Sequence, residues 1–317
     1  MAHGEDADLL AAQRSRFAAL DPALPAAAPL PSSSHDTRVE ALTAALPDGR
    51  RVTGGLVHAS HPAGSAHRLW SAAEVWELLP LVGDTGGAGM DALLRVWAER
   101  MRAIGPPTTD SACLVSWPSR DAEATRALLD HGFAPLTTLA VRRAAPQPVP
   151  RVEPLVVRRA RTADMDAMLQ LTLAELRYSA LVGAASLREN AVPLKRDALR
   201  KRLLDGDPVW VAERDGMTLG LADCAWTPVT EGSWAGSRLR PGRWGYINCA
   251  SVLPGARGNG IGRRLMDVVH AEFARAGAFG TYLYYNPPNP LSSVFWPRQG
   301  YRPLWTLWEA RPATALR

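Results

Sequence analysis

The sequence has few cysteines and no long apolar run. Its three cysteines, Cys113, Cys224 and Cys249, lie far apart and form no C-x-x-C pair. This argues against a disulfide framework and a zinc site, and it is typical of a reducing compartment. No stretch approaches the roughly 18 apolar residues that a membrane-spanning helix needs. The first ten residues carry acids and no basic segment, so no secretory signal is expected. We therefore expect a soluble, cytoplasmic protein with no membrane partner.

Lysine is almost absent: Lys195 and Lys201 are the only lysines among 36 basic residues, and the net charge is +5. The arginines are dispersed along the chain and do not cluster with aromatic residues on one element. Nucleic-acid-binding surfaces have such clusters, so no nucleic-acid partner is expected. The seven histidines are scattered, and His58 and His61 lack a second pair of ligands. No metal site is expected either.

The length of 317 residues, with 47% hydrophobic and 21% charged residues, predicts two globular domains. A short amphipathic helix is expected over 7–20, followed by a strap rich in proline and alanine up to residue 34. A second proline-rich segment, 144–154, divides the chain near its middle. We therefore expect domains over 35–143 and 155–317, joined by this linker.

An internal repeat links the two halves of the chain. Residues 132–143 read GFAPLTTLAVRR and residues 300–311 read GYRPLWTLWEAR, so six positions are identical without a gap. In the same register Asp121 corresponds to Asn289, and the strand-like ACLVSW corresponds to GTYLYY. A shared register at the end of both halves predicts a duplicated domain.

The second half predicts an α/β fold. A strand is expected over 155–160, and Thr162 is expected to cap the long helix that follows. A second helix is expected near 194–204, then a hairpin that turns at Asp215 and Gly216. The complete order is β-α-α-β-β-β-α-β-α-β. Because hairpins join consecutive strands, each domain should hold a mixed, partly antiparallel sheet flanked by helices.

The strongest chemical signal is the turn Arg257–Gly262, which reads RGNGIG between a strand and a helix. Glycines let consecutive backbone N–H groups converge, and the helix start adds unpaired N–H groups, which together form a cradle for a pyrophosphate. A P-loop would need a lysine that is absent here. A dinucleotide fingerprint would need a third glycine at position 263, which is arginine, so nicotinamide cofactors are disfavoured. A plain helix start after a turn remains the other reading.

The pattern R-x-x-G-x-G after a strand that ends Val252-Leu253-Pro254 resembles the acetyl-CoA loop of the GNAT superfamily of N-acyltransferases. Asn289 and the segment from Trp296 to Tyr301 stand where that family has further motif positions, and the resemblance covers essentially the whole second half. It implies acetyl-CoA as co-substrate, with the strand pairing to the pantetheine arm and a strand amide polarising the thioester carbonyl. The implied cofactor-binding residues are Val252, Leu253, Arg257, Gly258, Asn259, Gly260, Ile261, Gly262, Arg263 and Asn289.

The candidate catalytic residues are less well defined. The tyrosine with which this family protonates the leaving thiolate falls on Trp296, and an indole N–H cannot act as an acid. Tyr284 and Ser292 are nearby substitutes, and a thiol of pKa about 8.5 also leaves tolerably without help. The attacking amine must lose a proton, and Asp223 is a candidate for the base. For each of these side chains a purely structural role is the alternative.

The acceptor is expected to be a primary amine, on a small molecule or a peptide, which the sequence does not identify. Tyr246 and Asn248 alternate on the strand beside the acetyl site and share one face, whereas Cys249 is expected on the opposite face, in the core. Glu175 and Tyr178, late in the first helix of this half, lie where the family often builds its acceptor site. We expect Glu175, Tyr178, Tyr246 and Asn248 to contact the substrate.

The first half resembles a degenerate copy. A strand near 76–82 precedes the glycine-rich segment 83–89 and a helix, but the leading arginine and the G-x-G spacing are missing. Leu128 stands where Trp296 does. We expect this half to have lost CoA binding and to favour a monomer by covering a dimerisation surface. A non-catalytic acyl-CoA-binding sensor or scaffold is the alternative to an N-acetyltransferase.

Overall fold

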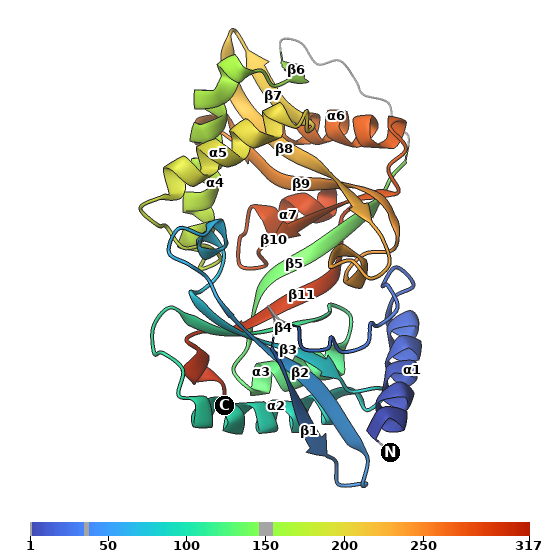
Figure 1. Cartoon of the computed structure of the whole chain (residues 1–317). Coiled ribbons are helices and arrows are strands. Elements are labelled where there is room, and N and C mark those ends of the chain that lie inside the picture. Colours follow the sequence, from blue (N-terminus) through green and yellow to red (C-terminus); the bar gives the residue numbers. More distant parts are fainter. Residues whose placement is uncertain (1, 35–37, 146–154) are drawn as a thin grey trace. The chain divides into compact units, whose positions relative to one another are not determined.

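The computed structural model describes residues 2–34, 38–145 and 155–317 (Figure 1). Nearly all of the linker expected over 144–154 lies outside the described residues. The chain forms two compact units. Unit 1 comprises Met1–Thr138, Glu231–Arg240 and Pro303–Arg317, and unit 2 comprises Leu139–Thr230 and Pro241–Arg302.

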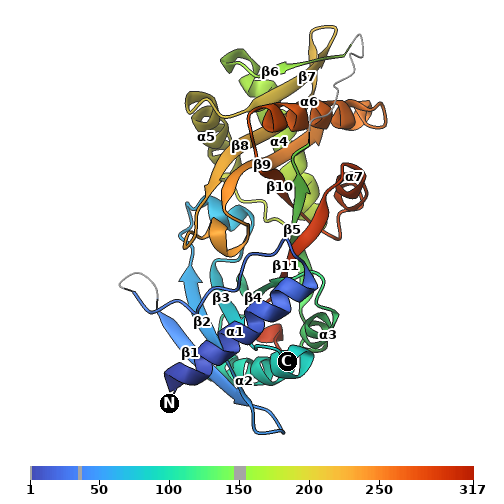
Figure 2. The same ribbon diagram turned by 90° about the vertical axis from the view of Figure 1, so that its right-hand side faces the viewer.

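Unit 1 is built on five strands. Its sheet has the order β1-β2-β3-β4-β11, in which β3 and β4 are parallel and the other neighbours are antiparallel. Helix α1 lies against β3 (Figure 2). The elements are α1 (Ala2–Leu20), β1 (Val39–Ala45), β2 (Arg51–Ser60), β3 (Glu74–Leu81), α2 (Gly86–Ile104), β4 (Ser111–Pro118), α3 (Ala122–Asp130) and β11 (Arg302–Ala310).

Unit 2 repeats this arrangement and extends it. Its strands follow the order β5-β10-β9-β8-β7-β6, with β9 and β10 parallel and β6 to β9 antiparallel. The elements are β5 (Ala134–Arg143), β6 (Val156–Arg159), α4 (Met165–Leu181), α5 (Ala191–Leu204), β7 (Val209–Arg214), β8 (Met217–Val229), β9 (Gly242–Val252), α6 (Ile261–Arg275), β10 (Gly280–Tyr285) and α7 (Ser292–Arg298). The predicted mixed sheet flanked by helices and the predicted element order are confirmed.

Local sequence explains two features of unit 2. The hairpin turns at Asp215 and Gly216, both of which have positive φ, as tight hairpins with right-handed strand twist require. Thr162, by contrast, was expected to cap helix α4, and this prediction is wrong. Thr162 begins a short 3₁₀ turn, and the N-cap of α4 is Asp164, whose Oδ2 accepts from the Arg161 backbone N–H at 2.7 Å. Asp164 is held there by Arg158, which binds both of its carboxylate oxygens at 2.8 Å.

Helix α6 contributes apolar side chains to the core of unit 2. Its buried face carries Leu265, Met266, Val269 and Phe273. A Cβ atom at Gly245 of β9 would come within 2.7 Å of the Phe273 ring, so a glycine is required for the helix to lie this close. The last turn of α6 is therefore packed tightly against the first part of β9.

The last strand of each half belongs to the other unit. Strand β11, from the end of the second half, pairs with β4 in unit 1, with Trp305 opposite Pro118 and Ala310 opposite Cys113. From Leu139 onward, β5 of the first half belongs to unit 2, where it neighbours β10. The boundaries of the compact units therefore differ from the domain boundaries expected near residues 143 and 155. Those expected boundaries describe the sequence repeat and stay a prediction.

Candidate active site

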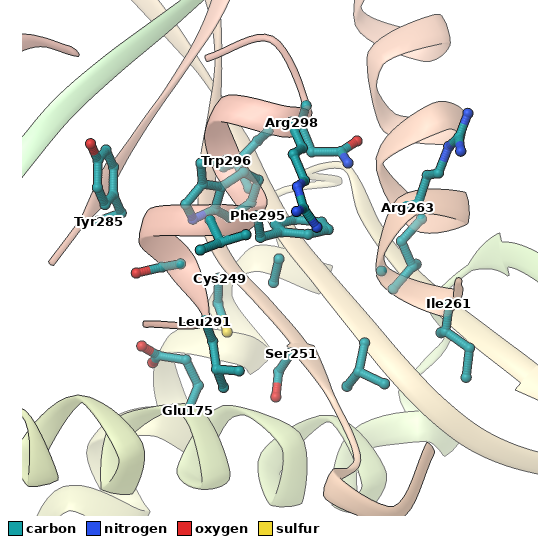
Figure 3. A pocket seen from close by; sticks show the side chains of 18 of the residues that line it. Glu175, Cys249, Ser251, Ile261, Arg263, Tyr285, Leu291, Phe295, Trp296 and Arg298 are labelled. Carbon is teal, nitrogen blue, oxygen red and sulfur yellow. The ribbon is translucent and has the colours of Figure 1, made fainter. Parts of the chain in front are cut away.

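The site begins where two parallel strands separate. The ladder between β9 and β10 ends, in the described chain, at the pair Ile247 and Leu283. On its other edge β9 stays paired with β8 as far as Val252, which lies opposite Gly220. The inner edge of β9 from residue 248 to 252 therefore borders a cleft. This cleft has a volume of about 1120 Å³ and is lined by β9, β10, α4, α7 and the glycine turn (Figure 3).

A bulge shapes the strand at the point of separation. Asp223 of β8 lies opposite Cys249 and Cys224 lies opposite Ile247, so Asn248 is an additional residue in β9. A bulge interrupts the alternation of side chains, and both Asn248 and Cys249 line the cleft. Cys249 is buried, as expected for a core residue, and burial raises the pKa of its thiol, but it also borders the cleft.

Backbone hydrogen bonds show which amides of β9 face the cleft. The N–H of Leu253 donates to the carbonyl of Leu219 at 2.9 Å, on the β8 side. Because backbone groups of alternate residues point to opposite edges of a strand, those of Val252 and Ala250 are directed to the cleft. The Leu253 amide is therefore bonded to β8, and the backbone groups of β9 that border the cleft are those of Ala250 and Val252.

The glycine turn lies open at one end of the cleft. Gly258 and Gly260 have φ of +83° and +74°, which side chains rarely adopt, and no heavy atom of the described residues lies within 4 Å of a Cβ added at either position. The first N–H groups of α6 follow immediately and lack partners within the helix. The Arg257 side chain donates from Nε to the Val252 carbonyl at 3.1 Å, and it lies 5.7 Å from the Tyr178 ring centre. These features fit a bound phosphate.

Arginine side chains add positive charge to the lining. Arg257, Arg263 and Arg298 all line the cleft, and Figure 3 shows Arg263 and Arg298 on the side away from Glu175. Arg142 also lines it and comes from β5, in the first half of the sequence. Arg142 was not predicted as a site residue, because no local pattern indicates that the last strand of one half lies in the other unit.

Glu175 of α4 is half-buried and points into the cleft (Figure 3). Burial raises the pKa of its carboxyl, against the opposing effects of the Ser179 hydroxyl and the Lys195 charge. Ser179, itself buried, donates from Oγ to Glu175 Oε1 at 2.7 Å. A carboxylate whose pKa is raised is a better proton acceptor at neutral pH than an ordinary one. The sequence analysis had placed Glu175 only among the substrate contacts.

Asp223, the base expected from the sequence, is buried beneath Asn248. Its Oδ1 lies 2.8 Å from Nε of Arg202, and its Oδ2 accepts from Asn248 Nδ2 at 2.5 Å. Burial raises the pKa of Asp223, and Arg202 opposes this. Tyr246 donates its hydroxyl to Asn248 Oδ1 at 3.1 Å and stacks on Tyr282. Asp223 and Tyr246 thus hold Asn248 in position from outside the lining.

The far wall of the cleft is formed by α7 and the loop before it. Asn289 accepts at Oδ1 from the N–H groups of Leu291 and Ser292, and so caps the start of α7. Ser292 donates its hydroxyl to the carbonyls of Asn286 and Asn289 at 3.3 Å. Trp296 is 7% exposed and packs edge-on against Phe295 and Tyr301. The position at which the resemblance leads us to expect the family's acid thus carries a buried indole.

The structure brings most of the predicted site residues to one cleft. Those that line it are Glu175, Tyr178, Asn248, Val252, Arg257, Gly258, Gly260, Ile261, Gly262, Arg263, Tyr284, Asn289 and Ser292. Four predicted residues, all among the described ones, are not part of the lining: Asp223, Tyr246, Leu253 and Asn259. Asn259 turns its side chain back to the Ala256 carbonyl at 3.3 Å.

Comparison with known proteins agrees with this geometry. A family model described as an acetyltransferase (GNAT) domain matches residues 205–303, which include β9, the glycine turn, β10 and α7. The chain therefore contains a GNAT acetyltransferase domain, and the resemblance noted in the sequence is confirmed.

Several solved structures are similar to the chain. A GCN5-related N-acetyltransferase from Sphaerobacter thermophilus has 17% identity over 84% of this chain and 78% of its own, with a TM-score of 0.49. One from Kribbella flavida has 15% identity over 87% and 90%, with a TM-score of 0.43. A GNAT family acetyltransferase from Brucella melitensis, solved in complex with acetyl-CoA, has 27% identity over 41% and 74%, with a TM-score of 0.30.

None of the helices in the described residues combines the length and the apolar character needed to cross a membrane. No group of three or more histidine, cysteine, aspartate or glutamate side chains among them is arranged to hold a metal ion.

Proposed function

We propose that unit 2 transfers an acetyl group from acetyl-CoA to a primary amine by direct attack, without an acyl-enzyme. The observation that carries this proposal is the cleft between the separating ends of β9 and β10, which has an open glycine turn at one end and Glu175 at the other. The cleft lies in the part of the chain that belongs largely to the GNAT domain.

The glycine turn and the arginines would bind the phosphates of acetyl-CoA. The first N–H groups of α6, from Ile261 to Arg263, have no partner within the helix, and a pyrophosphate could approach them because Gly258 and Gly260 carry no side chain. Arg263 and Arg298 supply complementary charge.

The inner edge of β9 would hold the pantetheine arm and the thioester. The backbone groups of Ala250 and the N–H of Val252 are directed to the cleft and can pair with the amides of the arm as an added strand would, whereas the Val252 carbonyl already accepts from Arg257 Nε. A backbone N–H directed at the thioester carbonyl stabilises the negative charge that develops on its oxygen during attack.

Glu175 is the base in this proposal. The amine nitrogen attacks the thioester carbonyl carbon, the carbon–sulfur bond breaks, and the proton lost by the nitrogen passes to the Glu175 carboxylate directly or through water. The thiolate leaves with the bonding electron pair and takes a proton from solvent or from Tyr284, whose side chain is 37% exposed at the cleft. Because a thiolate of pKa about 8.5 is a fair leaving group, no strong acid is required.

One observation favours a second function, an acyl-CoA-binding sensor or scaffold: Trp296 fills the place of the usual acid. The two functions are separated by incubating the protein with acetyl-CoA and a panel of small-molecule and peptide amines and measuring free thiol. Amine-dependent thiol release supports the enzyme. Binding of acetyl-CoA by calorimetry without release for any amine supports the sensor. Mass spectrometry of the acetylated product then identifies the acceptor.

The proposal includes the origin of unit 1 as a copy of the same domain. This is supported by the sequence repeat and by the strand order, since β1-β2-β3-β4 has the same pairing directions as β7-β8-β9-β10. A chain that carries both copies is proposed to act as a monomer, which sedimentation analysis can test.

A further inference from the structure

Unit 1 keeps the same strand separation as the cleft of unit 2. The parallel ladder between β3 and β4 ends, in the described chain, at Leu78 and Val115, although β4 continues to Pro118. On its other edge β3 stays paired with β2 as far as Leu81, opposite Thr53. A glycine-rich turn and helix α2 follow at once. The end of β3 therefore presents an inner edge of the kind that borders the cleft in unit 2.

Helix α1 occupies this edge through one buried amide side chain. Gln13 is 4% exposed, and its Oε1 accepts from the backbone N–H groups of Val82 at 2.8 Å and Gly83 at 3.3 Å. Its Nε2 donates to the carbonyl of Pro80 at 3.1 Å. Both ends of the amide are thus engaged with the backbone at the end of β3, against which α1 lies in Figure 2.

The same helix face reaches the other strand. One turn after Gln13, the Phe17 ring packs edge-on against Trp117 of β4, with the ring centres 5.4 Å apart. Arg16 extends to the start of α3, where its Nη2 lies 2.7 Å from Asp121 and 3.1 Å from Glu123. Helix α1 therefore contacts both strands that separate, and the region beyond them.

The space around the glycine turn of unit 1 is also occupied, by other residues of the same unit. A Cβ added at Gly83 would lie 3.1 Å from the Leu9 side chain of α1, and one at Gly87 would lie 2.9 Å from the backbone of Glu123. At the corresponding place in unit 2, Gly258 and Gly260 have no such neighbours among the described residues. The two turns have opposite surroundings.

We propose that the end of β3 and the turn after it form a binding site for an amide-bearing ligand, and that the chain's own helix α1 is the ligand. Gln13 presents an amide to the strand edge in the way that an added peptide, or the pantetheine arm proposed for unit 2, would do. An apolar residue at position 13 would leave the N–H of Val82 and the carbonyl of Pro80 buried without a partner, so the hydrophobic effect alone does not account for a glutamine here. With α1 in place, unit 1 takes no acyl-CoA.

The comparison with pantetheine depends on the function proposed for unit 2, but the α1 site can be tested by itself. Hydrogen exchange of the full chain, followed by mass spectrometry with and without saturating acetyl-CoA, reports both units separately. Residues 6–20 and 81–84 should be protected to the same extent with and without acetyl-CoA. Added protection should appear at residues 257–263. Calorimetry should give one equivalent of acetyl-CoA per chain. A second equivalent, or release of α1 on adding acetyl-CoA, would overturn the proposal. No added protection at 257–263 would instead contradict the function of unit 2.

The variant Gln13→Ala tests the contact directly. Losing hydrogen bonds worth about 1 kcal/mol each should speed exchange at Val82 and Gly83 about tenfold or more. Ser15→Ala, which changes an exposed residue of the same helix, should leave it unchanged. If Gln13→Ala does not fold, Gln13→Met keeps most of the side-chain volume and removes both the acceptor and the donor, and the same acceleration is expected. Exchange at residues 82 and 83 that equals the wild type in each folded Gln13 variant would overturn the proposal.

Discussion

The two units contain the same pair of separating parallel strands, and yet one pair encloses a cleft and the other is filled. In unit 2 the inner edge of β9 borders about 1120 Å³ of space. In unit 1 the edge of β3 is bonded to Gln13. The backbone geometry is shared, so it does not decide by itself whether a strand end binds a ligand. Whether the strand end can bind a ligand depends on whether another part of the chain already forms hydrogen bonds with its N–H and carbonyl groups.

The glycines of the two turns show the same difference. Gly258 and Gly260 are needed for their backbone conformation and leave space for an approaching phosphate. Gly87, in contrast, lies against the backbone of Glu123, where a side chain does not fit. Glycine-rich segments at equivalent places thus leave open space in one unit, where we propose that a phosphate binds, and allow internal packing in the other. Substitutions in the two turns should therefore have opposite consequences.

The largest effect is expected for Gly260→Asp. A carboxylate placed among the N–H groups that receive the pyrophosphate repels its charge, so acetyl-CoA affinity should fall by roughly 100-fold or more while the fold survives. Gly260→Asn has the same size without the charge and should lose much less. Calorimetry measures both. An unchanged affinity in Gly260→Asp would remove the turn from the phosphate site.

Glu175→Gln should reduce turnover by about 10²- to 10⁴-fold, the usual contribution of a general base, with acetyl-CoA affinity unchanged. The base must be unprotonated and burial raises the pKa of Glu175. As the pH is lowered, wild-type turnover should therefore begin to fall at a higher pH than the pKa of an ordinary carboxyl would give. The variant should lose this pH dependence. Glu272→Gln, at an exposed site on α6, is the control. A retained acid limb in Glu175→Gln would assign the proton to another group.

Gly87→Ala should act on stability instead of binding. Its Cβ would lie 2.9 Å from the Glu123 carbonyl oxygen, and the backbone must shift to admit it. We expect unit 1 to lose about 1–3 kcal/mol, with acetyl-CoA binding in unit 2 unchanged. Gly64→Ala, in the same unit and with no described atom within 4 Å, should be neutral. Thermal unfolding and calorimetry distinguish these outcomes, and weaker acetyl-CoA binding in Gly87→Ala would show that unit 1 takes part in it.

The smallest effect is expected for Trp296→Tyr. A phenol of pKa about 10 at this position could protonate the leaving sulfur, so turnover should be preserved or raised. Trp296→Phe fills similar space without the hydroxyl and serves as the matched control. Trp296→Ala should weaken packing against Phe295 and Tyr301. Steady-state kinetics with calorimetry would reveal a role of the indole itself if Tyr and Phe both abolish turnover with affinity intact.

The sequence predicts the features that depend on local patterns. The hairpin at Asp215 and Gly216, the order of elements in the second half and the glycine turn all follow from residue types and spacing. Most residues of the cleft follow from the family motif, because that motif is contiguous along the chain.

The remaining features depend on contacts between distant segments. The bulge at Asn248 arises from its pairing with β8, so alternation along β9 alone does not indicate that the buried Cys249 also borders the cleft. Asp223 looks like a free carboxylate until Arg202 of α5 is placed beside it. An amphipathic pattern over 7–20 indicates that one face of a helix is buried, but it does not indicate that Gln13 bonds to the end of β3.

The placement of β11 has a consequence for how the protein is made. Strands β1 to β4 are synthesised before all the segments of unit 2, yet the strand that completes their sheet beside β4 follows those segments in the sequence. Leu304, Trp305 and Trp308 of that strand are buried in the finished unit. During translation, the β4 edge of unit 1 therefore lacks its neighbouring strand until β11 has been synthesised. In unit 2, by contrast, β5 is synthesised before any other strand of that unit. The unit that is translated first is the one that is finished last.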